Sequence, residues 1–166
     1  MFEGRVLGVD PGLAATGLAV LSREEGSPGV VWADTIHTPA ELREAGRLRR
    51  LHETVTTAIR KHGVGCLAVE RVMWGRNVGS AMSVARATGV IMLAADEEGL
   101  PVEEYAPLEV KMAVTGVGNA TKEQIRLTLE RVHGIRPVPA ESNAADAVAV
   151  ALCHLQQSRL RAAAKQ

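Results

Sequence analysis

An apolar run that ends in a single acid opens the chain and constrains its fold more than any other stretch. Residues 6–10 read VLGVD, a Pro-Gly turn follows, and residues 17–21 form a second apolar run, GLAVL. Strands that are covered on both faces have continuous apolar sequences, so we expect the first strand to lie centrally in a sheet. Asp10 at its end has two possible roles. It accepts hydrogen bonds within the turn, as Asp before Pro-Gly often does, or it belongs to a site where its charge is paired or bound to a metal.

Short connections between the first apolar runs predict an antiparallel meander of three strands. Residues 24–29 are a turn rich in Gly, Pro and Ser, and the third strand covers residues 30–36. Thr38 and Pro39 then predict the start of a helix, with Thr38 as its cap and Pro39 as a favoured first residue. We expect this helix to end near Gly63.

A later apolar run, VGCLAVE at residues 64–70, repeats the pattern of the first strand and also ends in an acid, Glu70. Because a helix crosses over from the meander to this run, the new strand should lie parallel to the first. Asp10 and Glu70 are then expected at the carboxyl ends of neighbouring strands. Sheets in α/β proteins usually place their active sites at this edge.

A third acid, Asp146, lies near the start of the last predicted helix, in its first turn. The helix dipole alone would favour an acid there, but a capped helix start also holds a carboxylate rigidly. The other predicted elements are a helix over 78–97, an edge strand over 101–105, a short helix from Pro107, a helix over 122–133 capped by Thr121 or Asn119, and the last helix from 144 to about 163, capped by Ser142 or Asn143.

Length and composition narrow the class of protein. The 166 residues predict one domain, 1–166, in which the tail from about 157 is a candidate for disorder. No apolar run reaches the roughly 18 residues of a membrane span, and no signal-peptide pattern is present, so we expect a cytoplasmic protein without a membrane segment. Cys66 and Cys153 lack metal-ligand spacing and are expected to be buried and reduced, which argues against a zinc site.

The formal net charge is zero, yet the charges are unevenly distributed. Arg71, Arg76 and Arg86 fall in a stretch without any acid, and Met73 and Trp74 lie between the first two of these arginines. Aromatic and cationic side chains interleaved beside a carboxylate suit contact with nucleic acid, since bases stack on rings and phosphates meet arginine. A tryptophan that covers the end of the core fits this stretch equally well.

Five motifs, spread in order over residues 5–155, make the chain similar to a known family. They are GVDPGLAATG (8–17), AVERV (68–72), RNVGSAMSVARATGV (76–90), EVKMAVTGVGNATK (109–122) and AADAVAVALCH (144–154). Together they resemble the RuvC family of Holliday-junction resolvases, which belongs to the RNase H-like nucleases. The resemblance implies an α/β fold with a five-stranded mixed sheet, an antiparallel meander plus parallel strands, flanked by helices.

The same resemblance implies a metal-dependent endodeoxyribonuclease that resolves four-way DNA junctions by paired symmetric nicks, in DNA recombination and repair. Asp10, Glu70 and Asp146 would be its metal-binding catalytic carboxylates. The implied cofactor is two Mg²⁺ ions per subunit, with Mn²⁺ as a substitute. Lys111 and Lys122 match lysines that the family uses near the scissile phosphate.

DNA-binding residues follow from the resemblance and from the basic stretch. Met73 stands where relatives often place a Phe that stacks on bases at the junction centre, whereas the ring in this chain is one position later, at Trp74. Both are therefore candidates for the wedge. Arg71, Arg76 and Arg86 are the candidates for contact with the junction arms.

Asn143 is the main departure from the family pattern. Three residues before Asp146 the family usually has an acid or a histidine. Asparagine ligates a hard cation through its amide oxygen but carries no charge and cannot act as a base. Glu141 lies two positions away and is expected to project elsewhere. A second hypothesis therefore stays open, a protein that binds junction DNA with weak or no cleavage.

The expected assembly is a homodimer that presents two sites to a four-way junction. The small residues of the helix over 78–97 make it the candidate interface, because they let a second helix approach closely. The family resemblance also implies the RuvA–RuvB branch-migration complex as a partner. The sugar-kinase and actin-like ATPase class also ends its first strand in an Asp-x-Gly turn, but it needs two such domains, for which 166 residues leave no room.

Overall fold

A five-stranded mixed sheet forms the centre of the molecule. The computed structural model describes residues 4–24, 26–73, 75 and 77–163. Its strands follow the order β3-β2-β1-β4-β5, with β1 antiparallel to β2, β2 antiparallel to β3, and β1, β4 and β5 parallel. Their bounds are β1 Arg5–Asp10, β2 Ala15–Glu24, β3 Ser27–His37, β4 Val64–Glu70 and β5 Val102–Tyr105. The predicted meander plus parallel strands is thus confirmed, as is the central position of the first strand.

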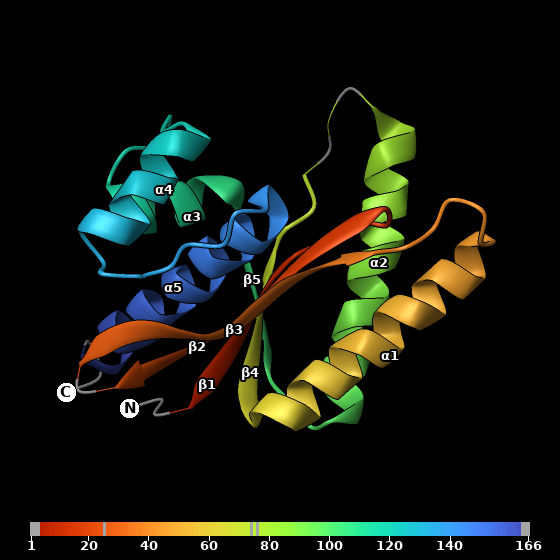
Figure 1. Ribbon diagram of the computed structural model, residues 1–166, viewed down its shortest axis with the longest axis horizontal. Coiled ribbons are helices and arrows are strands. Elements are labelled where there is room, and N and C mark those ends of the chain that lie inside the picture. Colours follow the sequence, from red (N-terminus) through yellow and green to blue (C-terminus); the bar gives the residue numbers. More distant parts are fainter. Residues whose placement is uncertain (1–3, 25, 74, 76, 164–166) are drawn as a thin grey trace.

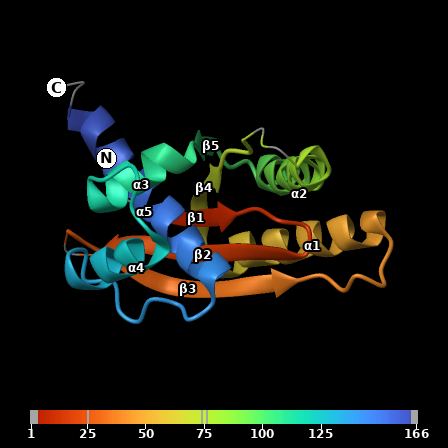
Figure 2. The same cartoon turned by 90° about the horizontal axis from the view of Figure 1, so that it is seen from above.

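Helices cover both faces of this sheet. Figure 1 shows α1 and α2 on one face and α5 on the other, with α3 and α4 beside α5, and Figure 2 shows the same layers from above. The bounds are α1 Glu44–His62, α2 Val78–Glu97, α3 Pro107–Thr115, α4 Lys122–Arg131 and α5 Ser142–Ala163. Whether the chain forms a single domain stays a prediction. The tail from about 157, a candidate for disorder, is helical in α5 as far as Ala163.

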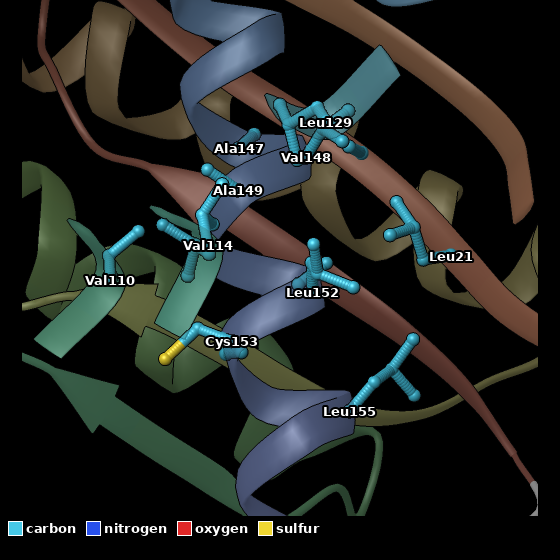
Figure 3. Packing of buried hydrophobic residues seen from close by; sticks show 14 of the residues in the cluster. Leu21, Val110, Val114, Leu129, Ala147, Val148, Ala149, Leu152, Cys153 and Leu155 are labelled. Atoms are coloured by element: carbon cyan, nitrogen blue, oxygen red, sulfur yellow. The ribbon is translucent and has the colours of Figure 1, made fainter. Parts of the chain in front are cut away.

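The alternation of side chains along β1 divides the core into two halves. Leu7 and Val9 are fully buried against α1 and α2, while Val6 is fully buried on the α5 side. Figure 3 shows the α5 half, where Val148 and Leu152 lie among side chains from β2, α3 and α4. Because β1 is covered on both faces, its sequence has the continuous apolar character of a buried strand.

The start of the first helix differs from the prediction. The helix begins at Glu44, and its N-cap residue is Arg43 rather than Thr38. Thr38 is instead almost fully buried, donates its hydroxyl to the Leu13 carbonyl and donates its backbone N–H to the Ala14 carbonyl. The Thr38–Pro39 pattern was misleading because this threonine forms hydrogen bonds with the backbone of a distant turn, a contact that local sequence does not reveal.

The start of the last helix also differs. The helix begins at Ser142, so Ser142 and Asn143 lie inside it, and its first turn holds no acid. Asp146 is therefore in the second turn, not the first. The favourable effect of an acid on the helix dipole falls off within the first turn, so the dipole does not account for this carboxylate.

Helix α2 has the predicted range, and Asn77 caps it by accepting a hydrogen bond from the Ser80 N–H at 3.1 Å. By length and composition, α2 is the one helix of the described residues that is long and apolar enough to cross a membrane. Its 18-residue window has a mean hydropathy of 1.5, and 28% of that window is buried. It packs on α1 and the sheet (Figure 1), and Val78, Met82 and Leu93 are exposed along its uncovered face. Length and composition alone are weak support for a span, because core helices of soluble proteins share them.

Candidate active site

Two carboxylates lie at the ends of neighbouring parallel strands. The register pairs Val9 of β1 with Val69 of β4, so Asp10 and Glu70, the next residues, end the two strands at the same edge of the sheet. The parallel crossover through α1 produces this arrangement. The predicted proximity of the two strand ends is confirmed.

Two glycines without side chains let α5 lie directly on the strands and bring Asp146 to the same edge. A Cβ on Gly17 would lie 1.8 Å from the Asn143 carbonyl oxygen, and a Cβ on Gly8 would lie 2.2 Å from the Ala147 carbonyl oxygen. Gly17 pairs with Asp10 across β1 and β2. The helix backbone on either side of Asp146 thus presses onto strand positions next to Asp10. Glycine inside a strand often marks such a close approach, so Gly8 and Gly17 were the sequence signal for the position of α5.

The three carboxylates line one cavity of about 400 Å³ together with two lysines. Asp10 comes from β1, Glu70 from β4, and Asp146 from α5, while Lys111 comes from α3 and Lys122 from the start of α4. Five predicted site residues from five elements are therefore brought together. Lys122 is placed by the cap of its helix, where the Thr121 hydroxyl accepts from the Gln124 N–H and the Gln124 side chain accepts from the Thr121 N–H.

The cavity disfavours negative charge on Asp10 and Glu70. Burial, and secondarily the charges of Glu70 and Asp146, raise the pKa of Asp10 to about 7, although Lys122 opposes the shift. Burial and the charge of Asp146 also raise the pKa of Glu70, against Lys122 and Lys111. Desolvation and like-charge repulsion act in the same direction here. Positive charge that enters the cavity therefore favours the ionised forms of Asp10 and Glu70.

Lys122 supplies part of that positive charge through a direct contact. Its Nζ lies 2.7 Å from Asp146 Oδ2 and 2.8 Å from Ser142 Oγ. The hydrogen bond to Asp146 raises the pKa of Lys122, so the ammonium stays charged. Ser142 had been assigned only a possible capping role in the sequence, and no local pattern indicated that its hydroxyl would meet a lysine 20 residues earlier.

The donor set suits a hard divalent cation, but the carboxylates do not yet converge on one point. Within the described ranges, no three His, Cys, Asp or Glu side chains are grouped closely enough to hold an ion. Carboxylate oxygens are the ligands that Mg²⁺ and Mn²⁺ prefer, and the raised pKa of Asp10 shows a site that needs cationic charge. The residues present therefore fit a divalent ion, provided that the Asp146 carboxylate is released from Lys122.

Asn143 does not join the carboxylates in the cavity. The described residues that line it do not include Asn143, whose carbonyl oxygen faces Gly17. Glu141 projects elsewhere, as expected, because its Oε2 pairs with His37 Nε2 at 3.1 Å, at the end of β3. Glu141 is thus engaged elsewhere, and Asn143 as a fourth ligand stays a prediction.

The candidate DNA-binding residues have different surroundings. Met73 is 58% exposed and, with Arg71, lines a second hollow of about 480 Å³ that also reaches Glu70. Arg86 forms an exposed ion pair with Glu44 on α1, with Nη1 2.9 Å from Oε1, and its contact with a junction arm stays a prediction. Trp74 and Arg76 lie outside the described residues.

Buried threonines hold the turn after Asp10 by hydrogen bonds that the sequence analysis did not predict. The hydroxyl of Thr16, which is almost fully buried, donates to the Gly12 carbonyl, and Thr38 holds Leu13 and Ala14 as described above. Arg47 of α1 donates from Nε to the Thr38 hydroxyl at 2.9 Å. The Thr16 contact is local, whereas Thr38 lies more than 20 residues after Leu13 and Ala14, and no sequence spacing indicated that contact.

Comparison with known proteins agrees with the fold and shows the family. The family model described as crossover junction endodeoxyribonuclease RuvC matches residues 6–154. Proteins with that same name from Syntrophomonas wolfei and Thermotoga petrophila are 39% and 38% identical, over 94% and 95% of this chain and 91% and 95% of theirs. A solved structure of T. thermophilus RuvC in complex with Holliday junction substrate has a TM-score of 0.88 and 31% identity, covering 95% of this chain and 96% of that one. The chain therefore belongs to the RuvC family of crossover junction endodeoxyribonucleases.

Proposed function

We propose that this nuclease resolves four-way DNA junctions by paired symmetric nicks, and that Asp10, Glu70 and Asp146 are the ligands of its divalent ions. The observation that carries the proposal is that carboxylates from three separate elements line one cavity in which negative charge is disfavoured. Structural carboxylates on a surface would be spread apart to avoid this repulsion. Carboxylates brought together at the carboxyl edge of a sheet are typical of a cation site.

The proposed cofactor is two Mg²⁺ ions per subunit, for which Mn²⁺ can substitute. When bound, such ions activate a water molecule and stabilise the leaving 3′ oxygen of the phosphodiester. The protein's contribution is to hold the ligands on rigid elements: Asp10 and Glu70 on strand ends and Asp146 on α5, which Gly8 and Gly17 allow to lie on the sheet.

Lys111 and Lys122 are proposed to hold the scissile phosphate. Both line the same cavity as the carboxylates, from α3 and α4. An ammonium group placed beside the phosphate stabilises the negative charge that grows in the transition state more than the charge of the ground state. In this proposal the two lysines bind and orient the strand, and the carboxylates keep the attacking water in position.

Junction DNA is proposed to reach the site across the hollow that Glu70 shares with Arg71 and Met73. Met73 is exposed enough to contact an unstacked base, and Arg71 is exposed beside it. Because arginine and lysine side chains would contact the phosphates, the affinity for junction DNA should fall steeply as the salt concentration rises. Association with a RuvA–RuvB complex stays an expectation from the family resemblance.

A homodimer is proposed to place two such sites on the two like strands of the junction. The uncovered face of α2 supports this part of the proposal, because Val78, Met82 and Leu93 are 54%, 46% and 51% exposed on a helix rich in small residues. An apolar helix face of this size is typical of a surface that a partner covers.

The proposal is tested by cleavage of a synthetic mobile four-way junction with Mg²⁺ and then Mn²⁺. The variant Glu70→Gln should lose at least about 100-fold in rate while still binding the junction, because a metal ligand is lost but the surface is kept. Glu104→Gln on neighbouring β5 is the matched control, since Glu104 is exposed and lies outside the cavity. Full cleavage by the Glu70 variant, or none by the unaltered protein with either ion, would refute the proposal.

The hypothesis of a junction-binding protein that does not cut rested on Asn143. The relatives named above are endodeoxyribonucleases and do not favour it. If position 143 supplies a ligand, Asn143→Asp or Asn143→His should increase the cleavage rate, because either residue adds a charge or a base that asparagine lacks. An unchanged rate in both variants would mean that position 143 contributes no ligand.

A further inference from the structure

The ion pair between Lys122 and Asp146 lies on the boundary between two hollows. Lys122 and Asp146 line both the 400 Å³ cavity of the carboxylates and a smaller hollow of about 220 Å³ between α4 and α5. Ser142 lines only the second of the two. The lysine therefore stands between the carboxylate cavity and a space into which its head group can move without losing Ser142.

Lys122 differs from Lys111 in how it meets the carboxylates. Its Nζ donates to both Asp146 Oδ2 and Ser142 Oγ, at 2.7 and 2.8 Å. For Lys111 the structure gives only the attraction of its charge to Glu70. The side chain of Lys122 is 71% exposed and that of Asp146 27%, so the ammonium is the movable partner and the carboxylate the fixed one.

We propose that the Lys122 ammonium and a divalent ion compete for the Asp146 carboxylate, and that Ser142 keeps the displaced ammonium at the rim of the cavity. The inference rests on the proposed metal site. A carboxylate oxygen in a 2.7 Å contact with an ammonium is shielded from a cation, so an ion that binds Asp146 must break that contact. Ser142 Oγ lies 3.5 Å from Asp146 Oδ2 and accepts from Lys122 Nζ at 2.8 Å, so in this inference the ammonium keeps its hydrogen bond to Ser142 while it turns away from Asp146 toward the smaller hollow, which Ser142 also lines.

The competition gives Lys122 two effects of opposite sign. The lysine weakens metal binding because it must be displaced, yet it aids the reaction because it stays beside the phosphate. Removing it should therefore strengthen the binding of the ion while weakening cleavage. A lysine that only bound phosphate would leave metal affinity nearly unchanged, so the binding of the ion alone distinguishes the two roles.

The test is Mn²⁺ binding to the full chain without DNA, followed by the electron paramagnetic resonance signal of free Mn²⁺. Lys122→Gln should bind Mn²⁺ about two- to fivefold more tightly than the unaltered protein, the range expected for removing a partly exposed ion pair. Lys111→Gln is the matched control, since it removes a charge from the same cavity without breaking a contact to Asp146. Its effect should be clearly smaller.

A second measurement follows the lysine itself. The chain has only four lysines, Lys61, Lys111, Lys122 and Lys165, so selective ¹³C labelling at Cε gives a spectrum that substitution assigns completely. Mg²⁺ should shift the Lys122 signal without narrowing it to that of a freely rotating side chain. In Ser142→Ala the same addition should narrow it, because the anchor is gone.

The outcomes separate this inference from the proposed function. If the unaltered protein binds no Mn²⁺, the metal site itself is wrong. If it binds Mn²⁺ but Lys122→Gln binds no more tightly, or Lys111→Gln gains as much, the competition is refuted while the metal site stands. A Lys122 signal that Mg²⁺ leaves unmoved would refute it equally.

Discussion

Replacing Asp10 by asparagine should stabilise the protein in EDTA, although it removes a proposed catalytic group. Burial and the neighbouring carboxylates raise the pKa of Asp10 from 3.8 to about 7. Between these values the folded protein binds more protons than the unfolded chain. Stability therefore falls as pH rises from about 4 to about 7 and stays reduced above that window. Asparagine has nearly the same shape and never ionises, so it escapes this penalty.

The size of the effect follows from the shift. One pKa unit corresponds to about 1.4 kcal/mol, so the difference between 3.8 and about 7 amounts to about 4 kcal/mol at pH 8. A buried amide that is not fully hydrogen-bonded costs about 1–3 kcal/mol, which offsets part of the gain. The expected net stabilisation of Asp10→Asn is therefore about 1–3 kcal/mol, or about 3–10 °C in Tm for a chain of this length.

Thermal unfolding in EDTA at about pH 4.5 and about pH 8 tests the reasoning, because the gain should be small at the lower pH and develop toward neutrality. Asp96→Asn at the exposed end of α2 is the control and should change Tm little at either pH. Addition of Mn²⁺ should stabilise the unaltered protein more than the Asp10 variant. A variant that is destabilised at pH 8, or equally stabilised at both pH values, would refute a buried, charge-repelled Asp10.

Two other substitutions test how the site is assembled. Gly17→Ala should lower the free energy of unfolding by about 2–3 kcal/mol or more in urea, because its Cβ would meet the Asn143 carbonyl oxygen at 1.8 Å. Gly46→Ala, with open space inside α1, should instead gain about 0.5–1 kcal/mol, and equal effects of the two would contradict the close approach of α5. Met82→Glu on the uncovered face of α2 should convert the proposed dimer to a monomer in sedimentation, whereas Met112→Glu, similarly exposed on α3, should not. A dimer that survives the first change, or is lost with the second, would place the interface elsewhere.

Local patterns were sufficient for the sheet and for two of the three carboxylates. The apolar runs that end in Asp10 and Glu70 predicted buried strands, and the intervening helix made those strands parallel neighbours. Both inferences depend on periodicity and on the handedness of crossovers, which hold whatever packs on the sheet. The range of α2 and the cap of α4 followed from similarly local signals at Asn77 and Thr121.

Positions that depend on distant contacts were predicted poorly. Thr38 had the pattern of a helix cap but is buried against Leu13 and Ala14, which lie more than 20 residues earlier. Arg86 belonged to a stretch without acids, and the sequence did not indicate its ion pair with Glu44 of α1. In both cases the partner comes from another element, and propensity or local charge carries no information about it.

The opening strand shows most directly what each level contributes. The sequence alone determined that VLGVD is a central strand with an acid at its carboxyl end, because only a strand buried on both faces tolerates such a continuous apolar run. The tertiary structure decided what that acid meets. Gly8 and Gly17 admit the backbone of α5, and this approach brings Asp146, already paired with Lys122, into the cavity of Asp10 and Glu70. A raised pKa and a shared cation are properties of side chains from separate elements, so they arise only when the fold brings those elements together.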